Sequence, residues 1–327
     1  MTDIVGMGAL NEDIIFTIKD GKEEELIKKI RKENRQHIVT YNDYKDYLNL
    51  QQRVGGGSAA NTVITLAVRD WKCSFIGELG NDETAAFVEK QLNKHGIKTL
   101  IKKVDGKTGS CGIVLHIDGK YSVLFKEGVS DDIEIGDDIL NEVRSCRIFH
   151  SSPFSSFKSL NSLKTQVALA AEAKNSGVVV SVSPGRLYTE TFSNDDKPEK
   201  RRLVEKLLSN SDIVFINKNE GHMVSGEEDY EKASEKIMKT FGIKVICMTL
   251  GSNGCHVRTA DEKISIDAIN TKPVATLGAG DAFTAGFLDS YLRGRDIIEC
   301  ARKGNEFAGL RIKHIDPKDY LSRIKVQ

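Results

Sequence analysis

The chain has 327 residues, of which 39% are hydrophobic and 29% are charged, and its 47 basic and 47 acidic residues cancel. This composition is typical of a globular protein with one large α/β domain or two smaller ones, and it lacks the positive charge that nucleic-acid binding requires. No apolar run is long enough to span a bilayer, and residues 1–5 lack the pattern of a secretion signal. The six cysteines form no Cys-x-x-Cys pair, so we expect reduced, buried thiols in a cytoplasmic protein.

Residues 4–10 predict a first strand, and Asn11 and Asp13 follow it, just before a second apolar run. Polar side chains at the carboxyl end of a strand in an open α/β sheet are where ligands bind. A plain turn is the alternative, because Asn and Asp favour turns without any ligand.

The charged residues 22–35 predict a short exposed helix, and Tyr41, Tyr44 and Tyr47 come after it. These tyrosines are interpreted either as cross-strand partners in a small sheet, which is the favoured interpretation, or as platforms against a substrate ring. A triple glycine, residues 55–57, then precedes Asn61 and a predicted helix. Such glycines let the backbone approach a ligand closely, although a flexible hinge would look similar.

Residues 99–126 predict short strands, with a hairpin turn at Asp118 and Gly119. From residue 147 onward, strand and helix patterns alternate. Strands are predicted at 148–150, 178–182, 213–216 and 244–248, and helices at 160–175, 203–208 and 231–240. This alternation predicts a mostly parallel sheet that helices cover on both faces.

Polar loops follow two of these strands. Asn217 and Glu220 come after the strand that ends at Ile216, and their spacing is also that of an ordinary helix start. The loop with Thr249, Gly251 and Gly254 follows the next strand, and the alternative there is a tight turn.

The most distinctive stretch is residues 276–287, in which Gly278, Ala279 and Gly280 precede Asp281 and a helical pattern. Free N–H groups at such a helix start would attract a phosphate or the charge of a transferring phosphoryl group. Asp281 has two interpretations of about equal weight on these residues alone. It is either the N-cap of the helix or a base that takes a proton from an attacking hydroxyl.

The stretch 276–287 resembles the C-terminal signature of the ribokinase (PfkB) family of sugar and nucleoside kinases, Asp-Thr-x-Gly-Ala-Gly-Asp. The stretch 55–61 resembles the family's Gly-Gly-x-x-x-Asn, and the other polar loops occur in the family's order along essentially the whole chain. The resemblance implies a single three-layer α/β/α domain over residues 1–327. It also implies a small β-sheet lid built from about 14–19, 36–54 and 99–126, and a homodimer through this lid is compatible with it.

The resemblance also implies roles for single residues. Asp281 would be the catalytic base beside an anion hole of Gly278, Ala279 and Gly280. The acceptor would lie on Asn11, Asp13, Gly56, Gly57 and Asn61. ATP would contact Asn217, Thr249, Gly251, Gly254 and Asn305, and Glu220 would act on a hydrated Mg²⁺.

Two departures from the family pattern matter. Ala275 replaces an Asp that is associated with the monovalent-cation site of some members, so the resemblance does not carry potassium dependence to this chain. Ser183 to Arg186 stand where many members carry Asp-x-Asn-x-Arg. The expected reaction is transfer of the γ-phosphoryl group of ATP to a small sugar. ADP as donor, a nucleoside as acceptor, and a non-catalytic sugar-binding relative stay open.

Overall fold

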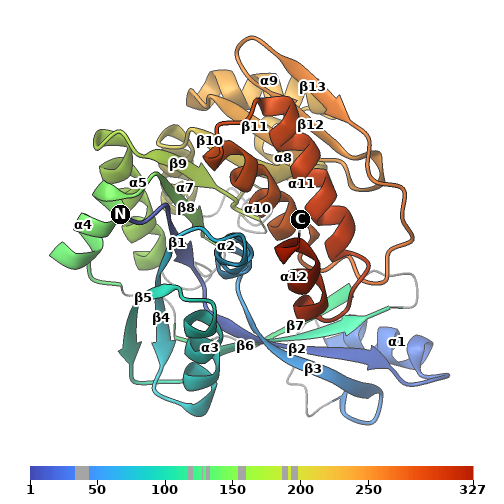
Figure 1. Cartoon of the computed structure of the whole chain (residues 1–327). Helices are drawn as coiled ribbons and strands as arrows, with labels where there is room; N and C mark the ends of the chain where they lie inside the picture. The colour runs from blue at the N-terminus through green and yellow to red at the C-terminus, as the bar shows by residue number, and fades with distance from the viewer. Residues whose placement is uncertain are drawn as a thin grey trace.

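A large twisted sheet forms the centre of the molecule, and helices cover both of its faces (Figure 1). The computed structural model describes residues 1–33, 44–116, 121–126, 128–129, 133–153, 160–185, 191–192 and 198–326. In the described part, the strands of the large sheet are, from edge to edge, β13 (Lys263–Ile266), β12 (Cys255–Arg258), β11 (Val245–Thr249), β10 (Ile213–Asn217), β9 (Val179–Val182), β8 (Ile148–Ser152), β1 (Ile4–Gly8), β4 (Cys73–Gly80) and β5 (Lys98–Val104). The three-layer α/β/α architecture expected from the resemblance is confirmed.

The strands from β11 to β5 all pair in parallel, and only the hairpin of β12 and β13 at the opposite edge is antiparallel. Strand β10 shows why its sequence is apolar throughout. Ile213 and Phe215 point into one hydrophobic core, whereas Val214 and Ile216 point into the core on the other face. A strand that is buried on both faces needs apolar residues at every position, which is the pattern that predicted the parallel sheet.

The helices divide between the two cores. On one face lie α2 (Ser58–Val68), α3 (Glu83–Lys94), α10 (Ala279–Leu292) and α11 (Ile297–Arg311), and α12 (Pro317–Lys325) packs against α2 and α11. The other face carries α4 (Asp137–Ser145), α5 (Asn161–Asn175), α7 (Pro198–Ser209), α8 (Lys218–Ser225) and α9 (Tyr230–Phe241). Aspartate N-caps fix the starts of α3, α9, α11 and α12. None of the described helices is long and apolar enough to cross a bilayer.

A second, smaller sheet lies beside the large one, with the order β3 (Leu48–Gly56), β2 (Asn11–Ile18), β6 (Gly109–Leu115) and β7 (Tyr121–Lys126). The central pair β2 and β6 is parallel, and the outer pairs are antiparallel. One face, with Ile15 and Ile113, packs toward Ala275 and Leu277. The other face packs against α1 (Glu23–Glu33) and Tyr44.

The structure corrects the expected limits of the lid. Residues 98–104 form β5 and pair with β4 in the large sheet, because Leu100 and Ile101 pack into the cores on its two faces. The expected hairpin pairing of β6 with β7 is present, although its turn, Asp118 and Gly119, lies outside the described residues. Residues 36–43 also lie outside them, so Tyr41 does too.

Two smaller expectations are also wrong. Asn11 and Asp13 do not form a turn, because they lie in the first half of β2 and pair with both β3 and β6. Tyr44 and Tyr47 are neither cross-strand partners nor platforms at a cavity. They precede β3 and pack against α1, with the hydroxyl of Tyr47 donating to Glu25 at 3.0 Å.

Candidate active site

A cavity of about 590 Å³, here called the first cavity, lies between the small sheet and the carboxyl ends of the strands of the large sheet. Parallel strands deliver their following loops to the same edge, which explains why segments distant in sequence meet there. The structure brings most of the predicted site residues to its wall. These are Asn11, Asp13, Gly57, Asn61, Asn217, Glu220, Thr249, Gly278, Ala279, Gly280 and Asp281.

The glycine-rich turn forms the start of α10 at the floor of this cavity. Gly278 is the N-cap, with a φ of 72° that favours glycine, and no side chain caps the helix. The N–H of Ala279 donates to the carbonyl of Thr276 at 3.3 Å, whereas the N–H groups of Gly280 and Asp281 have no hydrogen-bond partner among the described residues. A helix start with free donors that face a cavity attracts anions.

Asp281 is not the N-cap of α10, so that alternative interpretation is wrong. It is the third residue of the helix, and its carboxylate points toward α2. Ser58 donates to Oδ1 at 2.7 Å, and Asn61 donates to Oδ2 at 2.9 Å. Both carboxylate oxygens are therefore held in place beside the free N–H groups of the turn.

Two opposing effects set the pKa of Asp281. Burial raises the pKa of this carboxyl group, and the hydrogen bonds from Asn61 and Ser58 and the positive charge of Arg311 counteract that rise. The outcome is a pKa above the ordinary value for aspartate. Such a carboxylate is a better proton acceptor than a solvated one, because its pKa lies closer to neutrality.

Asp13 lies on the opposite wall, on the small sheet. Burial raises its pKa to about 7, and the negative charge of Asp281 adds to the rise, whereas the amide of Asn11, which donates at 2.5 Å, lowers it. Gly56 explains how this carboxyl group is accommodated. A Cβ at position 56 would stand 2.3 Å from Cγ of Asp13, so only glycine leaves room for that side chain.

Gly57 has a related structural reason. Its φ is 119°, and a Cβ there would stand 2.1 Å from the carbonyl oxygen of Ala9. The glycines of this stretch thus allow the backbone of β3 and α2 to approach their own chain closely. Whether they also touch an acceptor stays a prediction.

Asn217 and Glu220 form a capping box at the start of α8, so the helix-start interpretation is confirmed. The side chain of Asn217 accepts from the N–H of Glu220 at 2.9 Å, and Glu220 accepts from the N–H of Asn217 at 2.8 Å. Both residues also line the first cavity, and burial raises the pKa of Glu220 to about 7.

The side chains of Asn217 and Glu220 suit a Mg²⁺ ion only if waters and phosphate oxygens supply most of its ligands. The described residues contain no group of three His, Cys, Asp or Glu side chains that could hold a metal. A single carboxylate beside an open cavity fits a hydrated Mg²⁺ that is bound mainly by nucleotide phosphates, since Mg²⁺ keeps several of its waters.

Four predicted residues do not line the first cavity: Gly56, Gly251, Gly254 and Asn305. Gly251 and Gly254 belong to a tight turn, in which the N–H of Leu250 donates to the carbonyl of Gly254 at 2.8 Å, as the alternative interpretation expected. The amide of Asn305 donates to the carbonyls of Ile266 and Asp267, both at 3.1 Å, and so ties α11 to the end of β13.

Sequence reasoning missed several residues of the site. Ser58 stands directly after the triple glycine, but nothing in the local sequence shows that its hydroxyl reaches a carboxylate 223 positions away. Cys111, Ile113, Tyr121 and Val123 line the first cavity from the small sheet, and their alternation along β6 and β7 was the available signal. Arg311 ends α11 and belongs to no motif.

Several known proteins are similar to this chain. A protein of Archaeoglobus fulgidus described as an uncharacterized sugar kinase is 32% identical over 251 residues, which cover 76% of this chain and 95% of that protein. The cytidine kinase of Thermococcus kodakarensis is 30% identical over 260 residues, covering 77% and 86%. The structure of an adenosine kinase from Sinorhizobium meliloti superposes with a TM-score of 0.82 at 22% identity, covering 100% of this chain and 99% of that one.

The sequence profile described as pfkB family carbohydrate kinase matches residues 29–321, which is most of the chain. The ordered motifs, the two sheets and the match over this range point the same way. The chain therefore belongs to the pfkB family of carbohydrate kinases.

Proposed function

We propose that this kinase transfers the γ-phosphoryl group of ATP to a hydroxyl of a small sugar. The observation that carries the proposal is the position of the Asp281 carboxylate. Ser58 and Asn61 hold it beside the free N–H groups of Gly280 and Asp281, in one cavity. Phosphoryl transfer to an alcohol needs both parts together, a base for the hydroxyl proton and donors for the charged phosphoryl oxygens.

The roles of the chain's own residues follow from their places. Asn11, Asp13 and Asn61 would bind the hydroxyls of the acceptor, and the carboxylate of Asp281 would take the proton of the reacting hydroxyl. The N–H groups of the turn would stabilise the equatorial oxygens of the transferring group. Orientation supplies much of the rate, and the base adds roughly 10²–10⁴-fold.

The donor would lie across the ends of β10 and β11, where Asn217 and Thr249 line the first cavity. Glu220 would hold the waters of a Mg²⁺ ion, which supplies positive charge to the phosphates when bound. Gly251, Gly254 and Asn305 remain predicted nucleotide contacts, although they do not line the first cavity. Closure of the small sheet would exclude water and so protect the phosphoryl group from hydrolysis.

A nucleoside is the second candidate acceptor. Nucleosides need stacking partners, and the notable candidate is Tyr121, which lies on β7, lines the first cavity and is 40% exposed. The similarity to a cytidine kinase favours the same alternative. Tyr44 and Tyr47 pack against α1 instead. Phe154 and Phe157, two further aromatic residues that could stack on a base, lie outside the described residues. Cys111, Ile113 and Val123, which line the cavity from the same sheet, offer no ring for stacking, and this favours a sugar.

The decisive experiment is a measurement of ADP formation from ATP and Mg²⁺ with a panel of free sugars, sugar phosphates and nucleosides. A parallel thermal-shift screen would rank the acceptors, since a bound ligand raises the apparent stability. Turnover with a sugar supports the proposal, and turnover with nucleosides alone would replace it with the second candidate. Replacement of ATP by ADP, with AMP as the measured product, tests the other donor. Sugar binding without turnover by any donor would indicate a regulatory relative.

A further inference from the structure

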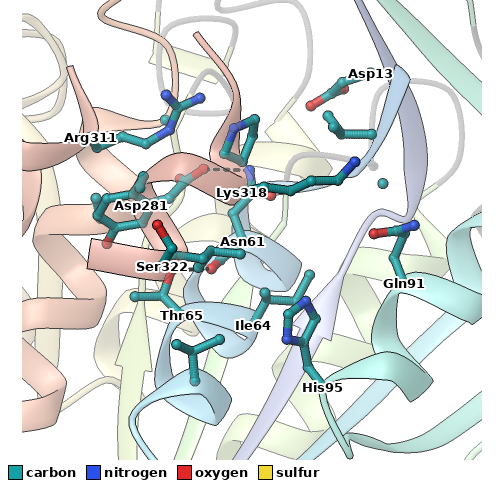
Figure 2. Close-up of a pocket in the computed structure, with 18 of the residues that line it drawn as sticks. Asp13, Asn61, Ile64, Thr65, Gln91, His95, Asp281, Arg311, Lys318 and Ser322 are labelled. Atoms are coloured by element: carbon teal, nitrogen blue, oxygen red, sulfur yellow. Dashed lines mark hydrogen bonds between the residues drawn. The ribbon is translucent and has the colours of Figure 1, made fainter. Parts of the chain in front are cut away.

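A second cavity, of about 370 Å³, lies on the other side of the Asp281 carboxylate (Figure 2). Its walls are α2, the end of α3, α12, the inner face of the small sheet and the end of α11. The two cavities share five residues: Asp13, Asn61, Leu277, Gly278 and Asp281. A ligand in the second cavity would therefore lie against the same carboxylate as a ligand in the first.

Four permanently or normally cationic side chains line the second cavity: Lys94, Arg311, Lys318 and Lys325. In the part of the chain that the structure describes, none of the four has an ion-pair partner within 4.0 Å. The chain as a whole has no net charge, so this local excess does not reflect a generally basic protein. Figure 2 shows Lys318 reaching from α12 across the cavity, between Asp281 and Gln91.

Arg311 is the residue that distinguishes this cavity from a surface with lysines. It is only 5% exposed, and Nη1 donates to the carbonyl of His314 at 2.6 Å. Its Nε lies 3.3 Å from the position that a Cβ of Gly278 would occupy, so the guanidinium packs directly on the glycine-rich turn. No other hydrogen bond of the guanidinium involves described residues. The carboxylates of Asp281, Asp316 and Asp13 act on its charge, but none of them forms an ion pair with it, so most of its N–H groups have no acceptor among the described residues.

Neutral donors complete the wall. Tyr320 is only 3% exposed, and its hydroxyl lies beside Thr65. This buried hydroxyl has no hydrogen bond of normal geometry to the described residues. Gln91 and Ser322 add an amide and a hydroxyl. This wall matches the oxygens of a phosphate monoester better than it matches a carbonyl or an apolar group. It offers the planar guanidinium of Arg311, the ammonium of Lys318 and several neutral hydrogen-bond donors.

The plain alternative is that the lysines are solvated and the cavity holds water. Lys94, Lys318 and Lys325 are exposed, and by themselves they would not indicate a ligand. The carboxylates of Asp13 and Asp281 also belong to the wall and oppose an anion. The four cations nevertheless outnumber them, and water alone would leave the buried guanidinium without an anion in ion-pair contact.

We propose that the second cavity is an anion site that binds the phosphate of a phosphorylated small molecule, with Arg311 and Lys318 as its principal contacts. The phosphate has two conceivable sources. It belongs either to the acceptor, which would then be a sugar or nucleoside that already carries one phosphate, or to a separate effector. The first source rests on the proposed kinase function, whereas the anion site itself does not.

The first measurement is the binding of inorganic phosphate to the full-length protein, by isothermal titration calorimetry at low ionic strength. Lys318→Gln should weaken phosphate binding by about threefold to tenfold, and Arg311→Gln by at least about tenfold. Lys313→Gln is the matched control, because Lys313 is exposed on the same segment and does not line the cavity. Lys318 is also exposed, so its variant keeps a result available if Arg311→Gln fails to fold.

The second measurement identifies the source of the phosphate. ADP formation is compared for pairs of acceptors with and without a phosphate, such as ribose with ribose 5-phosphate and fructose with fructose 6-phosphate. A phosphorylated acceptor preferred at least about tenfold in kcat/KM, with the preference reduced by Lys318→Gln but not by Lys313→Gln, indicates the acceptor. Phosphate binding that depends on Lys318 without such a preference indicates an effector.

The possible failures are distinguishable. If no acceptor is phosphorylated but phosphate binding still depends on Arg311 and Lys318, the proposed function is wrong and the anion site stands. If acceptors turn over normally while phosphate binds neither variant nor wild type, or binds all of them equally, the anion site is refuted and the proposed function stands.

Discussion

Replacement of Asp281 by Asn tests the role of its carboxylate with little change in shape. Asparagine keeps an acceptor for Asn61 or Ser58, but its amide group cannot take a proton. We expect kcat to fall by roughly 10²–10⁴, which corresponds to about 3–5 kcal/mol in the activation free energy. Nucleotide affinity should stay unchanged or improve slightly, because the variant removes a negative charge near the phosphates.

The expected effect of the same variant on stability is small, for a reason given by the site. Loss of a hydrogen bond to a charged acceptor lowers the free energy of unfolding by about 1.5–3 kcal/mol. Removal of the buried charge raises it, because burial of the Asp281 carboxylate is itself unfavourable, as its raised pKa shows. These effects oppose each other, so we expect the free energy of unfolding to stay within about 1 kcal/mol of the wild type. Urea unfolding measures this value, and coupled ADP detection across a Mg²⁺ titration measures turnover.

Asp289→Asn is the control for this experiment. Asp289 lies on the same helix and is 1% exposed, but it accepts from Trp71, Arg69 and Arg293 away from both cavities. The Asp289→Asn variant should have a lower free energy of unfolding than the wild type, and the kcat of its folded fraction should stay near the wild-type value. Near-wild-type turnover by Asp281→Asn would refute the assignment of the base, and recovery of its activity by high Mg²⁺ would show a metal-binding role instead.

Three further predictions concern the surroundings of the base. Ser58→Ala removes a hydrogen bond that lowers the pKa of Asp281, so the acid limb of the kcat/KM–pH profile should move to higher pH, and an unmoved limb would contradict this. Gly56→Ala should displace Asp13, raise the KM for the acceptor by at least about tenfold and leave nucleotide affinity unchanged. Steady-state kinetics measure both values, and an unchanged KM would show that Asp13 does not bind the acceptor. Burial raises the pKa values of Asp13 and Glu220 to about 7 in the fold, above the ordinary 3.8 and 4.5, so the folded state binds more protons than the unfolded state. The free energy of unfolding should therefore fall as pH rises from 4 to 7. Urea unfolding at several pH values measures that slope, which Asp13→Asn should reduce.

The sequence predicted the features that depend on local order. Three kinds of feature carry their signals within a few residues: the apolar strands with polar ends, the alternation of strands and helices, and the glycine-rich turns. The sequence therefore predicted the layers of the fold and most of the candidate residues that line the first cavity. The capping box at Asn217 is also local, and the alternative interpretation of that motif was correct. The N-cap interpretation of Asp281 failed because Gly278, with its positive φ, begins the helix and turns the carboxylate toward α2.

Features that depend on distant packing could not be predicted. Ser58 contacts Asp281, and Gln52 of β3 donates to Asp316 at 2.6 Å across 264 positions. Arg311 acquires its place only when α11, α12 and the glycine-rich turn pack together. The assignment of residues 99–104 to the lid failed for the same reason, since a short strand does not reveal which of two sheets it joins.

The helix α1 gives the small sheet an apolar core that is separate from the cores of the large sheet. Leu26 and Tyr44 seal the outward face of the sheet with Phe16 and Val114, so this face has its own hydrophobic core. Because, among the described residues, this core is built by the small sheet, α1 and Tyr44 alone, a movement of the sheet would not expose these apolar side chains. In the part of the chain that the structure describes, α1 and Tyr44 cover this broad face, whereas β3 and β7 are the edge strands of the small sheet and keep backbone groups without a strand partner.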